Sequence, residues 1–182
     1  MVSTLALDLA LPTSWARVKL EVGSQRLLGL VNNAGLFIKR EFGTWLAEDL
    51  DRLFRTNATG PLQLAQALAE NLDGDPPGHV LNISSMGGFQ GSVKFPGLLG
   101  YSASKAALAN ITECLAEEWK DRGICCNCLA LGAVDTEMLQ AAFPGYRAPV
   151  SASEMGRFIA RFTMEGHQQF NGKILPVSQS TP

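Results

Sequence analysis

Three short, mainly apolar runs constrain the fold of this chain more than any other feature. They lack the polar alternation of a half-exposed strand. They lie at Leu27–Val31, His79–Ile83 and Ile124–Ala130. Mainly apolar runs of this length are typical of parallel strands that are covered on both faces. Two weaker runs, Val2–Leu9 and Lys173–Val177, are also predicted to be strands. Since helical patterns separate the runs, the sequence predicts an α/β fold with a doubly wound parallel sheet.

The segments between the strands have the periodicity of helices, at Thr13–Val22, Leu46–Phe54, about Asn57 to Leu72, and Tyr101 to Trp119. A further helix is predicted to begin with the capping box Ser151-x-x-Glu154, which satisfies the first free backbone N–H groups. Its apolar face would carry Met155, Phe158, Ile159 and Phe162. No repeat, low-complexity tract or linker interrupts residues 1–182, so a single domain is predicted.

Composition excludes several functional classes. The 182 residues have a formal net charge of −2 and no basic cluster, so no nucleic-acid partner is expected. No apolar run approaches the roughly 18 residues of a membrane span. The first residues, Met-Val-Ser-Thr-Leu-Ala-Leu-Asp, lack the basic start and long apolar core of a signal peptide. We therefore expect a cytoplasmic protein without a membrane partner.

Three of the four cysteines, Cys125, Cys126 and Cys128, crowd into the predicted strand after Gly123, and the fourth is Cys114. A metal site is one interpretation, but no histidine is near in sequence and no second cysteine pair exists. Cysteine in a buried strand behaves as a small hydrophobic residue. Core packing is therefore favoured, and no metal site is predicted.

Polar and glycine clusters follow the predicted strands at the point where each strand ends. They are Asp8, Asn32-Asn33-Ala34-Gly35, Ser84-Ser85-Met86-Gly87-Gly88, and Gly132 to Thr136. In open α/β sheets, binding sites form at the carboxyl ends of the strands. This coincidence is the first indication of a functional site.

Tyr101 and Lys105 are four residues apart in a predicted helix, so their side chains share one face. A phenol with a pKa of roughly 10 is a poor acid or base at pH 7. A nearby ammonium favours the phenolate and lowers that pKa toward the working range. The pair is a candidate for proton transfer, although the same spacing occurs by chance on many helices.

The order of four motifs is more specific than any one of them. Asn32-Asn33-Ala34-Gly35, Asn57, Ser85 and Tyr101-x-x-x-Lys105 together resemble the classical short-chain dehydrogenase/reductase family, a likeness that extends over residues 2–177. The resemblance implies a Rossmann-like fold. It also implies an NAD(P)-dependent oxidoreductase that interconverts a carbonyl and a hydroxyl group by hydride transfer.

The resemblance assigns a role to each catalytic residue. Tyr101 would be the general acid/base, and Lys105 would lower its pKa and bond the nicotinamide ribose. Ser85 would hydrogen-bond the substrate oxygen. Asn57 would hold a water that links Lys105 to solvent. Taken alone, Asn57 could instead cap a helix, and Ser85 could be only a turn residue.

The implied cofactor is NAD or NADP, with a preference that the sequence does not reveal. At the adenosine end, the residues implied are Asp8 for the adenine amino group and Asn32, Ala34 and Gly35 near the ribose. At the nicotinamide end, the family turn would be matched by Gly132, Val134 and Thr136. Leu131 stands where the family usually has proline, and the loss of a fixed φ loosens this turn.

The family opens with a strand, a glycine-rich phosphate-binding turn and a second strand–helix unit, none of which we find in residues 1–182. At about 30 residues or more for each βαβ unit, roughly 50–60 residues of the family pattern are missing. We expect the sheet to be N-terminally incomplete, either because the sequence belongs to a longer chain or because the gene product is truncated. The strand at Leu27–Val31 would then lie at an exposed edge, and the strand at Val2–Leu9 would have no neighbour. The enzyme is therefore expected provided that the native protein contains the missing N-terminal part, and a non-catalytic binding or regulatory module derived from the family is the alternative function.

The predicted substrate is a small-molecule carbonyl or alcohol. Two segments, 89–100 and 138–146, carry apolar side chains that would either pack as ordinary loops or line a pocket for a hydrophobic substrate. These side chains are Phe89, Phe95, Leu98, Leu99, Met138, Leu139, Phe143 and Tyr146. The resemblance also implies a homodimer or homotetramer, assembled through the helices that begin near Asn57 and Tyr101.

Overall fold

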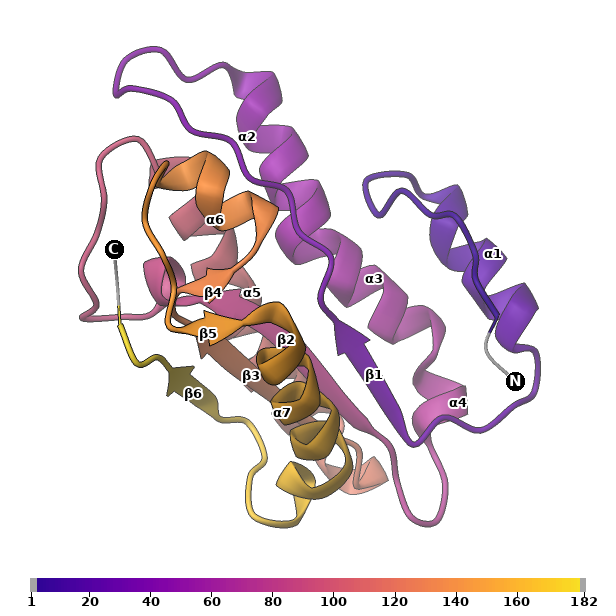
Figure 1. Ribbon diagram of the computed structural model, residues 1–182. Helices are drawn as coiled ribbons and strands as arrows, with labels where there is room; N and C mark the ends of the chain where they lie inside the picture. The colour runs from indigo at the N-terminus through magenta and orange to yellow at the C-terminus, as the bar shows by residue number, and fades with distance from the viewer. Residues whose placement is uncertain (1–2, 181–182) are drawn as a thin grey trace.

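The computed structural model of the protein describes residues 3–180 (Figure 1). Its centre is a parallel sheet with the strand order β1-β2-β3-β6. These strands are β1 (Gly29–Asn32), β2 (His79–Ser85), β3 (Cys125–Leu131) and β6 (Ile174–Val177). β2 and β3 pair along their whole length, so their carboxyl ends lie side by side. The predicted parallel sheet is confirmed.

Helices cover both faces of this sheet: α1 (Thr13–Val22), α2 (Ala47–Phe54), α3 (Gly60–Ala67), α4 (Ala69–Leu72), α5 (Leu99–Glu118), α6 (Glu137–Ala142) and α7 (Ala152–Glu165). On one face, α3 and α5 pack against Val80 and Cys126. On the other face, α7 packs against Leu81 and Leu129, and it lies in front of the sheet in Figure 1. Since successive side chains of a strand point to opposite faces, each face has its own core. The doubly wound arrangement is confirmed.

The strand predicted at Val2–Leu9 is wrong for the residues that the structure describes. Residues 3–8 pair with no strand, and residues 1–2 lie outside the described range. Asp8 instead opens a turn before α1: its carbonyl accepts from the N–H of Leu11 at 3.0 Å, and its Oδ1 accepts from the N–H of Ala10 at 2.9 Å. An apolar run becomes a strand only where a neighbour satisfies its backbone groups. Asp8 therefore does not follow a strand.

The prediction that Leu27–Val31 is buried on both faces is also wrong. β1 is at the edge of the sheet, and Leu28 and Val31 are 50% and 38% exposed. An edge strand has a neighbour on one side only, so fewer side chains cover it. The pattern of apolar residues identified the strand but not its position in the sheet.

The two helices predicted on either side of Asn57 are joined without a loop. α2 passes through a π-helical turn, Arg55–Thr59, directly into α3, and the two helices lie in line in Figure 1. Pro61 has no N–H to donate to the carbonyl of Asn57 in an α-helical ladder, which favours the wider turn. Asn57 is fully buried within this turn.

Between β3 and α7 the chain forms structure that the sequence did not indicate. Two short strands, β4 (Val134–Asp135) and β5 (Val150–Ser151), pair in parallel and enclose α6. The predicted capping box of α7 is confirmed: the Glu154 N–H donates to Ser151 Oγ at 3.3 Å, and the Ser151 N–H donates to Glu154 Oε2 at 2.9 Å.

Two of the three cysteines of β3 pack in the core as predicted, and Cys125 is only partly buried. Cys126 and Cys128 are fully buried, whereas Cys114 is exposed on α5. Burial raises the pKa of the Cys128 thiol to about 11 and raises that of Cys126 further. Both thiols are therefore protonated at neutral pH and act as small apolar side chains.

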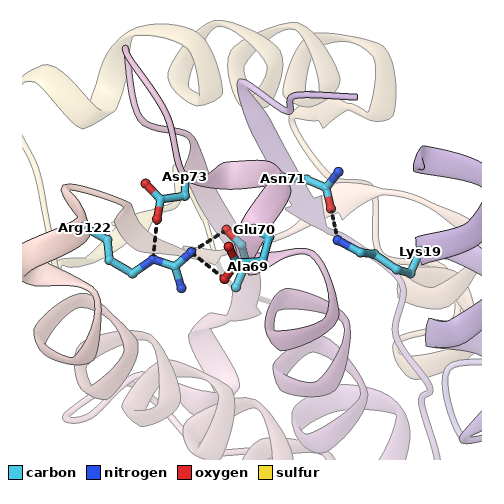
Figure 2. A network of polar contacts seen from close by, with 6 residues as sticks. All are labelled: Lys19, Ala69, Glu70, Asn71, Asp73 and Arg122. Carbon is cyan, nitrogen blue, oxygen red and sulfur yellow. Dashed lines mark hydrogen bonds and ion pairs between the residues drawn. The ribbon is translucent and has the colours of Figure 1, made fainter. Parts of the chain in front are cut away.

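Ion pairs and hydrogen bonds tie together the segments that lead into β2 and β3 (Figure 2). Arg122 pairs with Asp73 at 2.7 Å and with Glu70 at 3.1 Å, and it also donates to the carbonyl of Ala69. The ammonium of Lys19, at the end of α1, donates to Asn71 Oδ1. These contacts join α1, α4 and the turn after α5 at the amino end of the sheet.

Candidate active site

A cavity of about 600 Å³ lies at the carboxyl ends of β2 and β3. Ser85 and Leu131, the last residues of these strands, line it, and Tyr101 and Lys105 line it from α5. Its volume is within the range of small-molecule sites, about 300 to 1,000 Å³. The apolar part of the wall includes Phe37, Phe95, Leu98, Met138, Leu139, Phe143, Met155 and Ile159.

Tyr101 lies near the start of α5, with the ring of Phe37 edge-on to its own ring at a centroid distance of 5.3 Å. Gly100 allows α5 to approach the side chains beneath it, since a Cβ there would lie 2.8 Å from Trp45 and 2.9 Å from Leu53. Burial raises the pKa of Tyr101, and the nearby Ser85 hydroxyl opposes that rise. The net shift is therefore upward, opposite to the lowering predicted from Lys105, because burial outweighs the effect of the Ser85 hydroxyl.

Two adjacent serines at the end of β2 have different partners. Ser85 Oγ accepts from the N–H of Gly87 at 3.1 Å and so caps the 3₁₀ turn Met86–Gly88, while the residue lines the cavity beside Tyr101. Ser84 is buried, and its hydroxyl donates to the carbonyl of Lys105 at 2.8 Å. Ser84 thereby anchors α5 to the sheet, whereas Ser85 is close to the Tyr101 phenol.

Lys105 is 4% exposed, and its ammonium donates to the carbonyl of Ile83 at 2.8 Å. Burial lowers its pKa to about 8. The loop after β1 passes close by: a Cβ on Gly35 would lie 3.3 Å from Lys105 Nζ and 3.5 Å from Asn57 Oδ1. Gly35 therefore lies close to both Lys105 and Asn57.

Asn57 does not line the cavity, and its side chain acts as a link within the described residues. Its Oδ1 accepts from the N–H of Leu36 at 2.7 Å, and its Nδ2 donates to the Leu36 carbonyl at 2.8 Å and to Ser104 Oγ at 2.9 Å. Ser104 in turn donates to the carbonyl of Tyr101 at 2.8 Å. Asn57 therefore connects the loop after β1 to the first turns of α5. It does not cap a helix through its side chain.

The residues predicted to hold the nicotinamide end all line the cavity, and those predicted for the adenosine end are divided. Lining it are Gly35, Gly132, Val134 and Thr136, whereas Asp8, Asn32 and Ala34 do not. Thr136 also caps α6, because its Oγ1 accepts from the N–H of Leu139 at 3.2 Å. Gly132 has no room for a side chain, since a Cβ there would lie 2.1 Å from Ser178 Oγ.

Asn32, the last residue of β1, is instead buried outside the cavity. Its Nδ2 donates to Asn82 Oδ1 at 2.8 Å, and Asn82 Nδ2 donates to Thr112 Oγ1 at 2.9 Å. Its own Oδ1 has no partner among the described residues. Asn32 therefore joins β1 to β2, which is a structural link rather than a contact in the cavity.

Several residues that line the cavity are not among those predicted from the sequence. Asn33 and Phe37 follow β1 and line it, and α7 adds Met155 and Ile159. Asn33 belongs to the polar cluster Asn32–Gly35 that follows β1, and this signal applies to it as much as to its neighbours. Met155 and Ile159 were expected on the apolar face of a helix, where a core residue and a cavity residue have the same pattern.

A family model described as short chain dehydrogenase matches residues 3–147. The chain belongs to the short-chain dehydrogenase family. The resemblance that its motifs indicated is confirmed. Within the described residues, no helix combines the length and the apolar character needed to cross a membrane.

Curated relatives in this family have several activities. L-xylulose reductase of Caenorhabditis elegans is 37% identical over 111 residues, which are 60% of this chain and 43% of that protein. Protein FixR of Bradyrhizobium diazoefficiens is 36% identical over 154 residues, or 79% and 51%. Acetoacetyl-CoA reductase of Rhizobium meliloti is 33% identical over 126 residues, or 69% and 50%. The chain thus spans about half the length of the curated relatives it matches.

Solved structures share the fold over nearly the whole chain. A short chain dehydrogenase/reductase family protein superposes with a TM-score of 0.82 at 25% identity, covering 96% of this chain and 74% of that one. ElxO with NADP bound superposes with a TM-score of 0.80 at 24% identity, covering 97% and 76%. The Rossmann-like α/β fold expected from the resemblance is therefore confirmed.

Proposed function

We propose that this protein is an NAD(P)-dependent oxidoreductase that interconverts a carbonyl and a hydroxyl group, with Tyr101 as general acid/base. One observation carries the proposal: Ser85, Tyr101 and Lys105 come from two different elements and line one mainly apolar cavity. The reaction belongs to the dehydrogenase and reductase class (EC 1.1.1.-). The cofactor is NAD or NADP, and the protein acts in the cytoplasm.

The nicotinamide end of the cofactor fits the residues that are present. The hydroxyls of Ser85 and Thr136 and the ammonium of Lys105 belong to residues that line the same cavity, and such donors suit ribose hydroxyls and a carboxamide. Gly35 leaves space beside Lys105 that a Cβ would restrict. The phosphate-binding glycine turn of the family is not found in residues 1–182, so only the nicotinamide end is assigned to this chain's residues.

The proton chemistry follows from the protonation states of this chain's own residues. Burial raises the pKa of Tyr101, so the phenol is protonated at neutral pH and ready to donate to a carbonyl oxygen. The Ser85 hydroxyl, close to that phenol, would bond the same oxygen. Lys105, with a pKa of about 8, is mainly charged at pH 7 and would stabilise the phenolate that remains. When bound, the nicotinamide supplies or accepts the hydride.

The mainly apolar wall of the cavity favours a hydrophobic carbonyl or alcohol as substrate. A charged group placed among such side chains would lose its hydration without gaining a partner. We also infer assembly as a homodimer or homotetramer through α3 and α5, which analytical ultracentrifugation of the protein would test. Sedimentation as a monomer at micromolar concentration would contradict that inference.

Tyr101→Phe tests the function. Removal of the phenolic hydroxyl should lower turnover of a ketone panel with NADH or NADPH by about 10²–10⁴-fold, because general acid–base catalysis contributes that much. Tyr146→Phe is the matched control, since the Tyr146 hydroxyl bonds Ser180 and the residue does not line the cavity. Absorbance at about 340 nm follows the nicotinamide in this assay.

The outcome separates the enzyme from the alternative of a non-catalytic module. An enzyme loses turnover in Tyr101→Phe and retains it in Tyr146→Phe. Equal turnover in both variants would contradict the proposed role of Tyr101. Cofactor binding by the parent protein without turnover on any member of the panel would favour the non-catalytic module.

A further inference from the structure

Three segments that are far apart in sequence meet at the wall of the catalytic cavity. They are residues 37–40 after β1, residues 95–98 before α5, and the end of α6. The N–H of Arg40 donates to the carbonyl of Gly97 at 3.1 Å. The rings of Phe95 and Phe143 meet edge to face, with their centroids 5.0 Å apart, and both line the cavity.

Lys39 joins all three segments. Its ammonium donates to the carbonyl of Ala142 at 3.1 Å and lies 5.8 Å from the centroid of the Phe143 ring. Its stem passes over Gly97, where a Cβ would lie 3.1 Å from Lys39 Cγ. Gly97 has a φ of +83°, a conformation that also favours glycine. Within residues 3–180, Lys39 forms no ion pair with a carboxylate.

The Lys39 ammonium binds a carbonyl at the carboxyl end of α6. Ala142 is the last residue of α6, and the final carbonyls of a helix have no partner within the helix. A cation at this end also interacts favourably with the helix dipole. Ala142, Met138 and Leu139 of α6 line the cavity. Lys39 therefore holds in place a short helix whose side chains form part of the substrate wall.

We propose that Lys39, Phe95 and Phe143 form a clasp that fixes α6 at the cavity and limits the substrate to compact hydrophobic carbonyl compounds. This selection rests on the proposed function. The two rings close the wall by contact with each other, so a bulky substituent would have to separate them. The nearby ammonium is engaged by a carbonyl and a ring, which leaves an anionic substrate without this partner.

The clasp can be tested without any activity. Hydrogen exchange of the amides of Gln140 in α6 and of Phe143 directly after it would be compared between the parent protein and Lys39→Met. Loss of one hydrogen bond should speed their exchange roughly fivefold. Lys94→Met is the matched control, because the Lys94 ammonium bonds Phe89 and Ser92 and does not reach α6. Unchanged exchange in Lys39→Met would overturn the clasp.

The selection is tested with two ketones of different size, acetophenone and 4-phenylacetophenone. In Phe143→Ala, the ratio of kcat/KM for the larger over the smaller ketone should rise about tenfold, because the wall opens. Lys39→Met should shift the same ratio in the same direction by less. A constant ratio in both variants would overturn the selection. Absence of turnover in the parent protein would overturn the proposed function, while the exchange measurement would still decide on the clasp.

Discussion

The two ends of β2 hold polar side chains in opposite ways. At its carboxyl end, Ser85 lines a cavity together with Tyr101. At its amino end, His79 is fully buried, and both of its ring nitrogens have partners. One strand therefore carries a polar group that is open to a ligand and another that is closed to it.

The contacts of His79 define its protonation. Asn127 Oδ1 accepts from the N–H of Lys173 at 3.0 Å, so its Nδ2 faces His79 Nε2 at 3.0 Å. Nε2 must then be an acceptor, and the proton of the neutral ring is on Nδ1, which donates to the carbonyl of Thr163 at 2.9 Å. A second proton on the ring would meet the Asn127 amide hydrogens. His79 is thus held neutral as a link between β2, β3 and α7.

A shifted pKa does not by itself identify a functional site. Burial lowers the pKa of Lys105 and that of His79. Structural networks and catalytic groups both shift pKa values. What separates the two residues is access, because Lys105 lines the cavity and His79 does not.

Among substitutions that compare the polar residues Ser85, Lys105 and His79, Ser85→Ala should have the largest effect. Loss of a donor to the substrate oxygen should lower turnover by about 10²–10³-fold. The free energy of unfolding should fall by only about 1 kcal/mol, since the serine caps a single short turn. Steady-state kinetics and urea unfolding measure the two quantities. A large loss of stability with normal turnover would place Ser85 in the same class as His79.

Lys105 should give the next largest effect, which appears in alkali. Its pKa of about 8 in the folded protein is below its ordinary value of 10.5, so the unfolded chain binds more protons between these values. Stability from this residue therefore increases as the pH rises from about 8 to 10.5, by roughly 3 kcal/mol at most.

A comparison with Lys105→Met isolates the pH-dependent stability that Lys105 contributes. The parent protein should gain stability relative to the variant over that pH range, as measured by urea unfolding at each pH. The constant cost of leaving the Ile83 carbonyl without its donor cancels in the difference. Parallel pH profiles would show that Lys105 is not desolvated.

His79 should give the smallest effect, and it appears in acid. Burial lowers the pKa of His79 from its ordinary value of 6.5. Just below pH 6.5, the unfolded chain therefore binds a proton on His79 that the folded chain does not bind. The stability that His79 provides is complete above its unfolded pKa and is lost as the pH falls below it. The charged groups around the ring include His167, whose ring centroid is 5.6 Å away and whose charge would oppose protonation further.

The variant His79→Leu tests this end of the strand. At pH 8 it should be about 1–3 kcal/mol less stable, because the Asn127 amide and the Thr163 carbonyl lose their partner. The deficit should shrink toward pH 5, and turnover at pH 8 should be unaffected at temperatures where the protein is folded. A deficit that does not change with pH would contradict the neutral, buried state of His79.

The sequence predicted the elements whose signals are local. The apolar runs of β2 and β3 and the capping box of α7 needed no knowledge of their neighbours. The segment at Val2–Leu9 has a similar composition but lacks a pairing partner among the described residues, and partners are not encoded in the run itself. The apolar run of β1 did not indicate its edge position either, which was expected only from the absence of the family's first strands.

The same limit applies to the site. The motifs placed Ser85, Tyr101 and Lys105 at one cavity, because the carboxyl ends of parallel strands meet at one edge. The direction of the Tyr101 pKa shift could not be predicted, since it depends on how deeply the phenol is buried. Phe37 and Lys39 carry no pattern of their own, and only their contacts reveal them.

The amide of Asn57 has a further consequence. Its two bonds to the backbone of Leu36, one accepted and one donated, are the pair that a residue of an adjacent antiparallel strand would make. The Asn57 side chain therefore supplies at Leu36, beyond the last residue of β1, the two hydrogen bonds that a neighbouring strand would otherwise provide. Aspartate has the same shape but no donor, and glutamine is one methylene too long. Among these three side chains, only asparagine both accepts from and donates to the Leu36 backbone at this distance.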